Sequence, residues 1–367
     1  MFSEAFRIGM TIFILGSQLL LLPPIYVFWH QILKPVKLFS HWLYWKIDSI
    51  MYECMIIVVS SWTDQAGHSL VECGEDITAF VDKPCILMSN HQYPSDIGVL
   101  MRALVTKDSV FQRVMWIMDW VFQFANFGWV SKGHGDFFLL QPVDAKKFGS
   151  FLGSSYFSKV LKYQESMLTA NLVENFNDSC KSMKWVILFP EGGFLSRRLP
   201  GSQRYAKKND LPILNHVAIP RLGALNIVTK ALSSSNDKVG KSCAWSYIID
   251  ITIGYKRPIT PVQHMLRYNY EKSVITVHYR VFDCSKVMSS AGDSYEEKLK
   301  NWTYERFYEK ENLLDHFYQY GYFPNQHSTQ YQTKNIIGFK YWGIHLFCLV
   351  SWFVIKYSIV RVLQYAL

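Results

Sequence analysis

The sequence has few charged residues and few cysteines for its length. Aspartate, glutamate, lysine and arginine make up 18% of the 367 residues, below the ~25% of an average soluble domain, while 50% are hydrophobic. The seven cysteines are odd in number, scattered and never spaced as Cys-x-x-Cys. This argues against a disulfide framework and a structural zinc site, so we expect no metal and a domain exposed to the reducing cytosol.

Sequence patterns for nucleic-acid binding are also missing. We find no zinc-finger spacing, no RNP-like motif and no long basic helix, so we expect no nucleic-acid partner. The net charge of +9 suits phospholipid headgroups or nucleotide phosphates instead. Aromatic residues reach 16%, which is typical of the membrane–water interface, although a large aromatic core in a soluble protein accounts for it equally well.

The N-terminal region contains a long run without charge. Residues 8–29 carry no charged side chain and are numerous enough to cross a bilayer, which needs about 20 apolar residues. Pro23 and Pro24 interrupt the run, so a kinked or partly re-entrant helix is one outcome. We assign residues 1–38 as an N-terminal transmembrane segment. More positive charge follows the run than precedes it, which predicts that the downstream domain is cytosolic.

Two further apolar stretches flank the central region. Residues 42–62 are broken by Lys46, Asp48 and Glu53, so we predict that 39–70 contain an interfacial or core-packed helix. Residues 336–363 predict a C-terminal membrane helix. Its uncharged centre, 341–355, is short for a full crossing, and whether it spans the bilayer stays open. Both flanks therefore predict a lipid bilayer as a partner.

Residues 71–330 show short apolar runs that alternate with helical patterns. This alternation predicts an α/β domain in which helices cover a mixed sheet. The expected helices are 96–104, 157–176 and 304–317. The expected strands are 85–89, 185–189, 216–220, 248–254 and 274–282.

The most informative motif directly follows the first predicted strand. Residues 90–96 read Asn-His-Gln-Tyr-Pro-Ser-Asp, so that four residues separate His91 from Asp96 (an HX4D motif). Histidine can accept a proton near neutral pH, and a carboxylate on its other ring nitrogen would fix the tautomer. Pro94 favours a helix start, which would place Asp96 in a first turn facing a histidine at a strand end. A capping loop with a solvated histidine is the alternative.

A second motif follows the predicted strand 185–189. Residues 189–193 read Phe-Pro-Glu-Gly-Gly, and the glycines Gly192 and Gly193 allow backbone N–H groups to approach a ligand. Glu191 lies at the carboxyl end of a strand, where open α/β sheets bind ligands. Positively charged side chains that could hold a phosphate come next: Arg197, Arg198, Arg204, Lys207, Lys208 and Arg221.

Four blocks in this order resemble the lysophospholipid (1-acylglycerol-3-phosphate type, PlsC-like) acyltransferase family. They are the NHxxxxD block at 90–96, Gly-Asp-Phe-Phe-Leu-Leu-Gln at 135–141, Phe-Pro-Glu-Gly at 189–192 and Val-Ala-Ile-Pro at 217–220. Within the family, residues 134–138, 189–194 and 206–212 most resemble the branch that acylates lysophosphatidylglycerol.

The resemblance implies a glycerolipid-acyltransferase-like fold, a membrane-bound enzyme and a set of site residues. His91 would be the general base and Asp96 its orienting partner, with acyl-CoA as co-substrate and no bound cofactor. The implied location is the endoplasmic reticulum membrane, with the catalytic domain facing the cytosol. Substrate-binding roles are implied or proposed for Asn90, Glu191, Gly192, Gly193, Arg197, Arg198 and Pro220.

The sequence departs from the family pattern at two positions linked to binding glycerol phosphate. Gln141 stands in place of an arginine, and Gly193-Phe194 replaces the usual Thr-Arg. We therefore expect an acceptor with a larger phosphodiester head, lysophosphatidylglycerol or lysophosphatidylethanolamine. Lysophosphatidic acid and monoacylglycerol are alternatives, as is a non-enzymatic membrane scaffold. A serine hydrolase is disfavoured, because residues 67–71 lack the last glycine of a GxSxG elbow.

Overall fold

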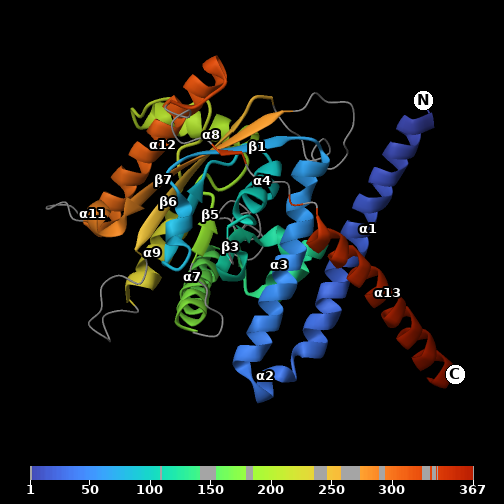
Figure 1. Ribbon diagram of the computed structural model, residues 1–367. Coiled ribbons are helices and arrows are strands. Elements are labelled where there is room, and N and C mark those ends of the chain that lie inside the picture. Colours follow the sequence, from blue (N-terminus) through green and yellow to red (C-terminus); the bar gives the residue numbers. More distant parts are fainter. Residues whose placement is uncertain are drawn as a thin grey trace.

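A single mixed sheet forms the centre of the computed structural model (Figure 1). The structure describes residues 2–107, 110–140, 154–178, 185–234, 246–257, 273–288, 294–324, 331–332, 336 and 338–366. The eight strands lie in the order β4-β3-β5-β2-β6-β7-β1-β8. Their bounds are β1 Ser69–Gly74, β2 Cys85–Ser89, β3 Val114–Asp119, β4 Phe137–Leu139, β5 Trp185–Leu188, β6 Tyr247–Tyr255, β7 Val274–Asp283 and β8 Tyr331–Gln332.

Five neighbouring strands, β4-β3-β5-β2-β6, run parallel, whereas β7 is antiparallel to β6. β1 is parallel to β7, and β8 is antiparallel to β1. In the central register Met88 of β2 faces Leu188 of β5 on one side and Asp250 of β6 on the other. The carboxyl ends of β2, β5 and β6 therefore meet at one edge, where open α/β sheets place their ligand sites.

Helices cover both faces of the sheet, and the two faces follow the alternation of side chains along the strands. Leu87 of β2 packs with α3 (His41–Gln65) and α4 (Ser95–Leu104) in the larger core. Ile86 and Met88 face the opposite way, toward α7 (Ser154–Asn177), α9 (Gly223–Ser234) and α12 (Tyr295–Tyr320). β2 is buried along its whole length as a result.

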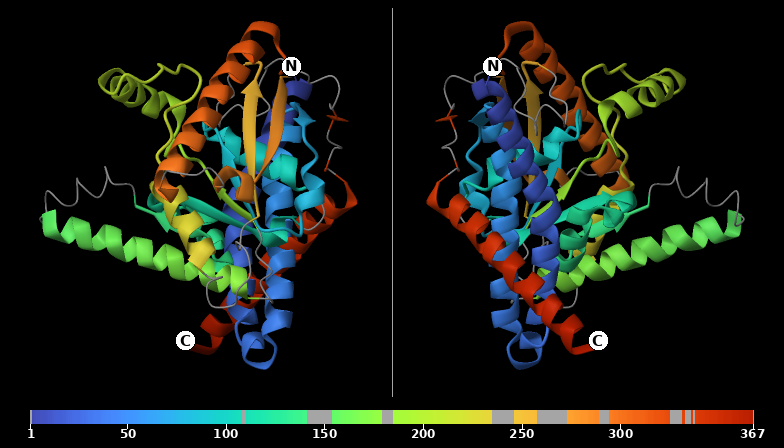
Figure 2. Two further views of the ribbon diagram at one scale, coloured as in Figure 1. Left: turned by 90° about the vertical axis from the view of Figure 1, so that its left-hand side faces the viewer. Right: turned by 90° about the vertical axis from the view of Figure 1, so that its right-hand side faces the viewer.

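Two terminal helices extend from the helix-covered sheet. α1 (Phe2–Leu33) is followed by the short α2 (Val36–Phe39), after which α3 returns beside α1, and α13 (Phe339–Ala366) crosses α1 (Figures 1 and 2). Among the described residues, two segments are long and apolar enough to cross a membrane, Gln18–Phe39 and Phe339–Val362. Only 28% and 11% of their respective apolar windows are buried, so neither resembles the core helix of a soluble protein.

The predicted mixed sheet flanked by helices is confirmed, and most predicted elements agree with the structure within a few residues. α1 is one helix through Pro23 and Pro24. α3 buries 14 of its residues, so much of it is core-packed. Among the described strands, β1, β3, β4 and β8 were not predicted from the sequence.

The strand predicted at 216–220 is wrong. The segment is buried, yet its backbone donors are taken by side chains instead of a neighbouring strand. Val217 donates to Glu311, Ala218 to Glu191 and Ile219 to Ser202. Pro220 has no N–H, so no donor along this run is left to form a sheet ladder.

Candidate active site

The site is assembled from three loops at the shared carboxyl edge of β2, β5 and β6. His91 lies in the loop after β2, and Asp96 lies in the first turn of α4. Glu191 follows β5, and Tyr255 is the last residue of β6. The topology thus brings together residues up to 164 positions apart in the sequence.

The predicted pair of His91 and Asp96 is in hydrogen-bond contact. Nδ1 of His91 lies 2.9 Å from Oδ2 of Asp96, whose side chain is fully buried. Because an ionised carboxylate only accepts, Nδ1 carries the hydrogen and Nε2 presents its lone pair. Within the described part of the chain, Nε2 of His91 has no hydrogen-bond partner. The imidazole is therefore oriented as a base.

Aromatic side chains fix the plane of the His91 ring. Phe189 stacks on it with ring centroids 4.0 Å apart and an interplanar angle of 18°, and Phe194 approaches to 4.6 Å. Only 7% of His91 is exposed. Phe194, one of the two departures from the family pattern, thus packs directly on the histidine.

Glu191 is a buried bridge between two loops. Oε1 accepts the backbone N–H of His91 at 2.7 Å, and Oε2 accepts the N–H of Ala218 at 2.9 Å. Burial raises the pKa of Glu191 to about 8, although both N–H donors favour the ionised form. Its carboxylate is engaged with the protein, and its predicted substrate-binding role stays a prediction.

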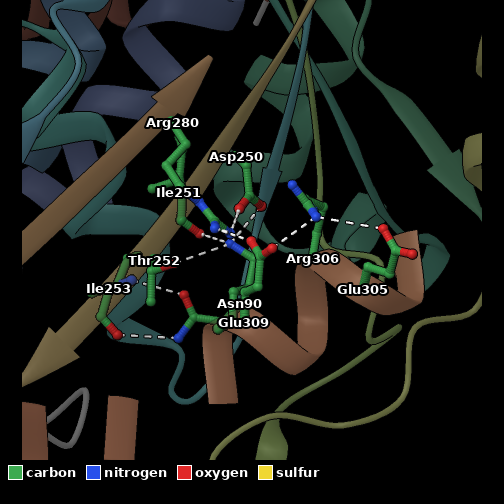
Figure 3. Close-up of polar contacts among 10 residues, drawn as sticks. Asn90, Asp250, Ile251, Thr252, Ile253, Arg280, Glu305, Arg306 and Glu309 are labelled. Carbon is green, nitrogen blue, oxygen red and sulfur yellow. Dashed lines mark hydrogen bonds and ion pairs between the residues drawn. The ribbon is translucent and has the colours of Figure 1, made fainter. Parts of the chain in front are cut away.

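Asn90 also makes contacts within the protein. Its side-chain amide donates to the carbonyl of Ile253 at 3.1 Å and accepts the N–H of Ile253 at 2.8 Å, as a strand residue would (Figure 3). This pair continues the β2–β6 ladder beyond Ser89. On the same strand, Lys310 of α12 bonds to the carbonyl of Ile251 and pairs with Asp250 at 2.7 Å, which fixes α12 to β6.

The Gly-Gly turn leads from β5 into α8 (Leu195–Lys208). Gly192 and Gly193 have φ values of +70° and +145°, which favour glycine. A Cβ on Gly193 would lie 3.3 Å from Cδ of Arg198, so the arginine stem covers this turn. The N–H groups of Gly193 and Phe194 make no hydrogen bond within the described ranges. They are free to bind a ligand oxygen.

Arginines border the site on the α8 side. Arg198 donates from Nε to the carbonyl of Glu191 at 3.0 Å, and the N–H of Arg221 donates to the carbonyl of Pro190 at 2.7 Å. Burial and the charge of Arg221 lower the pKa of Arg198. Among the described residues neither guanidinium pairs with a carboxylate, while Arg197 is exposed nearby. Two neighbouring unpaired cations form a site suited to an anion.

Of the other predicted residues, Pro220 is buried in the segment that Glu191 holds. Gln141 lies outside the described residues. Within the described ranges, no group of three or more His, Cys, Asp or Glu side chains is arranged to hold a metal ion. The sequence reasoning missed the contact of Tyr255 with Asp96, and no local pattern marks it, because 159 positions separate the two.

Two family models match neighbouring parts of the chain. Residues 70–263 match the acyltransferase family model, and residues 264–342 match the acyltransferase C-terminus model. The chain belongs to the acyltransferase family, which confirms the predicted resemblance, and it is an enzyme of that class.

The chain is 37% identical to acyl-CoA:lysophosphatidylglycerol acyltransferase 1 of Mus musculus, over 85% of this chain and 81% of the relative. It is 38% identical to the Homo sapiens protein of the same name, over 82% and 79%. It is 28% identical to the putative 1-acyl-sn-glycerol-3-phosphate acyltransferase acl-12 of Caenorhabditis elegans, over 80% and 72%. The crystal structure of PlsC from Thermotoga maritima aligns with a TM-score of 0.44 and 10% identity, covering 85% of this chain and 97% of that one.

The bridge formed by Glu191 generates a first prediction. Glu191→Gln places an NH2 group against one of the two backbone N–H donors, and leaving a buried donor unpaired costs about 1–3 kcal/mol. We expect a lower midpoint of thermal unfolding and reduced turnover. In the wild type the raised pKa of Glu191 means that stability is lost as the pH rises from the ordinary value of 4.5 through about 8, and Gln removes this dependence.

Glu311→Gln is the matched control, because Glu311 accepts N–H groups from residues 215–217 of the same segment but lies on α12. Thermal unfolding in detergent at pH 5 and pH 8 measures the effect. If the unfolding midpoint of Glu191→Gln had the same pH dependence as that of the wild type, the prediction would be contradicted.

Proposed function

We propose that this enzyme transfers a fatty acyl group from acyl-CoA to the hydroxyl of a lysophospholipid, in phospholipid remodelling. The observation that carries the proposal is the His91–Asp96 pair, whose Nε2 is available as a base. Lysophosphatidylglycerol is the favoured acceptor, because it appears in the names of the two relatives at 37% and 38% identity. Lysophosphatidylethanolamine is the second choice.

In the proposed reaction His91 acts as general base. Nε2 takes the proton of the lysolipid hydroxyl while its oxygen attacks the thioester carbonyl, and Asp96 stabilises the resulting imidazolium. The C–O bond forms and the C–S bond breaks, and the imidazolium returns the proton to the CoA thiolate. Products are the diacyl phospholipid and CoA. Neither a covalent acyl-enzyme nor a bound cofactor is needed.

The tetrahedral intermediate needs donors for its oxyanion. The backbone N–H groups of Gly193 and Phe194 are the best placed, because they precede α8 and the Phe194 ring lies against His91. Their lack of partners within the described residues supports this role, and the N-terminus of α8 adds a favourable dipole. Gly192 and Gly193 would then serve by shaping the turn.

The arginines beside the turn suit the phosphate of the acceptor. Arg198 and Arg221 supply the positive charge that Phe194, in place of an arginine, does not provide, and Arg197 is close enough in sequence to contribute. A phosphodiester acceptor would use these cations, whereas monoacylglycerol has no phosphate. The second source of anionic oxygen is CoA itself, which the experiment below distinguishes.

A membrane location is part of the proposal. α13 exposes large apolar side chains, including Phe353 at 61% and Trp352 at 42%, which would be costly in water. With Gln18–Phe39, this gives two segments suited to lipid. We propose the endoplasmic reticulum membrane, with the catalytic domain on the cytosolic side.

The first test concerns the base. His91→Ala should lower kcat by about 10²–10⁴-fold, the usual contribution of a general base. Asp96→Asn should also lower it strongly, since an amide cannot stabilise the imidazolium. Release of CoA from acyl-CoA and lysophosphatidylglycerol by purified protein is the measurement. Near-normal turnover of His91→Ala would refute the mechanism, and inactivity of the wild type on every lysolipid would favour a scaffold.

The second test concerns the cations. Replacing Arg198 and Arg221 together by Ala should raise KM for lysophospholipid by about 10–100-fold, as expected for losing hydrogen bonds to a charged group. KM for monoacylglycerol and for acyl-CoA should not change. The double Lys variant keeps the charge but not the guanidinium geometry, so its KM for lysophospholipid should lie between those of the wild type and the double Ala variant. A rise in KM for acyl-CoA alone would assign the arginines to CoA.

The third test concerns the bilayer. p-Benzoylphenylalanine in place of Phe353, in full-length protein reconstituted into phosphatidylcholine vesicles, should form photoadducts with lipid. The matched probe replaces Asn301, an exposed residue of α12, and Figure 1 shows α12 on the side of the sheet away from α13. Mass spectrometry of adducts is the readout. Adducts only to a second protein copy, or equal lipid labelling at both positions, would contradict the proposal.

A further inference from the structure

Asp96 is held by a second strand in addition to its own loop. The phenol of Tyr255, the last residue of β6, donates a hydrogen bond to Oδ1 of Asp96. The other oxygen, Oδ2, accepts from Nδ1 of His91 and from the backbone N–H of Tyr93, both at 2.9 Å. Both oxygens are therefore occupied, and Tyr255 is the donor on the side away from the histidine.

The position of Tyr255 is fixed by its surroundings. β6 pairs with β2 up to Ser89 and Ile251, and the Asn90 side chain extends that pairing to Ile253. The Tyr93 ring packs edge-on against Tyr255 with centroids 5.4 Å apart. Only 1% of Tyr255 is exposed, and this burial raises its pKa well above the ordinary value. The phenol therefore stays protonated and available as a donor.

We propose that Tyr255 is a positioning residue of the acyl-transfer reaction, which tunes the basicity of His91 through Asp96. The inference rests on the proposed function, in which His91 is the base. A phenol that donates to Oδ1 draws negative charge away from Oδ2, and less charge then remains to stabilise the imidazolium. Tyr255 thereby limits how strongly Asp96 stabilises the imidazolium, and it holds the carboxylate in the plane that the imidazole needs.

The other titratable groups around the pair lie on several elements. Tyr93 is in the same loop, and Glu191 comes from the turn after β5. α12 contributes Tyr318, which donates to Gln92 at 2.8 Å, and Lys310 near Glu191. Ser95 of α4 contacts the phenol of Tyr255 itself, and among the described residues the phenol is the side chain that donates to Oδ1.

Tyr255→Phe tests the inference, because it removes the hydroxyl and keeps the ring. We expect kcat to fall about 3–30-fold with KM for both substrates unchanged. The acidic limb of the kcat/KM profile should move to higher pH by about 0.5–1 unit, since a more negative Asp96 stabilises the imidazolium. Replacing Tyr255 by 3-fluorotyrosine, a stronger donor of the same shape, should move the limb to lower pH.

Tyr279→Phe is the matched control. Tyr279 also donates from a buried phenol to a carboxylate, Glu72 at 2.6 Å, but lies on β7 away from the site. It should lower the unfolding midpoint without moving the pH limb. The inference would be overturned if the acidic limb of the kcat/KM profile stayed at the wild-type pH in both Tyr255 variants. It would also be overturned if Tyr279→Phe moved the limb by the same amount. His91→Ala assayed in parallel separates this failure from that of the proposed function, which would appear as retained turnover.

Discussion

The hydrogen bonds of Glu191 are the constraint on which the site depends. A carboxyl group with no exposed surface is costly to bury, and it is tolerated here because each oxygen receives a backbone N–H. One of these N–H groups belongs to His91. The carbonyl of His91 in turn accepts the N–H of Leu195, at the start of α8. The peptide of the base is thus fixed by the segment after β5, and the dyad, the glycine turn and α8 form one unit.

The sequence predicted the parts of the site whose partners are close along the chain. His91 and Asp96 are five positions apart, and a strand end followed by a helix start is enough to bring them together. β2 and β5 were predicted correctly because strands buried on both faces read as continuous apolar runs. The segment 216–220 also contains an apolar run, but the side chains of Glu191, Ser202 and Glu311 take its backbone donors, and Pro220 has none to offer.

Contacts across long separations were beyond sequence reasoning. Tyr255 reaches Asp96 because β6 lies next to β2, which is a property of strand order and leaves no local pattern. Glu191 and Asn90 were predicted to bind substrate on motif grounds, whereas the structure engages both side chains with backbone groups of the protein. Polar residues in a motif next to a strand end can serve the fold and the chemistry alike, and spacing alone does not separate these roles.

The apolar terminal helices are connected to the catalytic domain by polar contacts. Gln18 of α1 donates to the hydroxyl of Tyr341 of α13 at 2.9 Å and accepts from Nε1 of Trp62 of α3 at 2.7 Å. Also between α1 and α3, Asp48 of α3 accepts from Tyr26 at 2.7 Å and lies 3.0 Å from Nδ1 of His30. Such bonds are specific where water is scarce, so α1, α3 and α13 are built into the domain and are not a detachable anchor.

This division assigns chemistry and recognition to different parts of the site. The groups that orient His91 are buried and hydrogen-bonded within the protein, so their positions depend little on which lipid binds. Arg198 and Arg221 are only half-buried and have no carboxylate partner among the described residues, so they are available to a ligand. Phe194 adds to this separation of roles. Its ring packs on His91 at a position where the family pattern has a positively charged arginine. In the proposed reaction the charge for the headgroup would come from Arg198 and Arg221 and not from the residue beside the base, so acceptor identity could change at those two positions without altering the proton transfer.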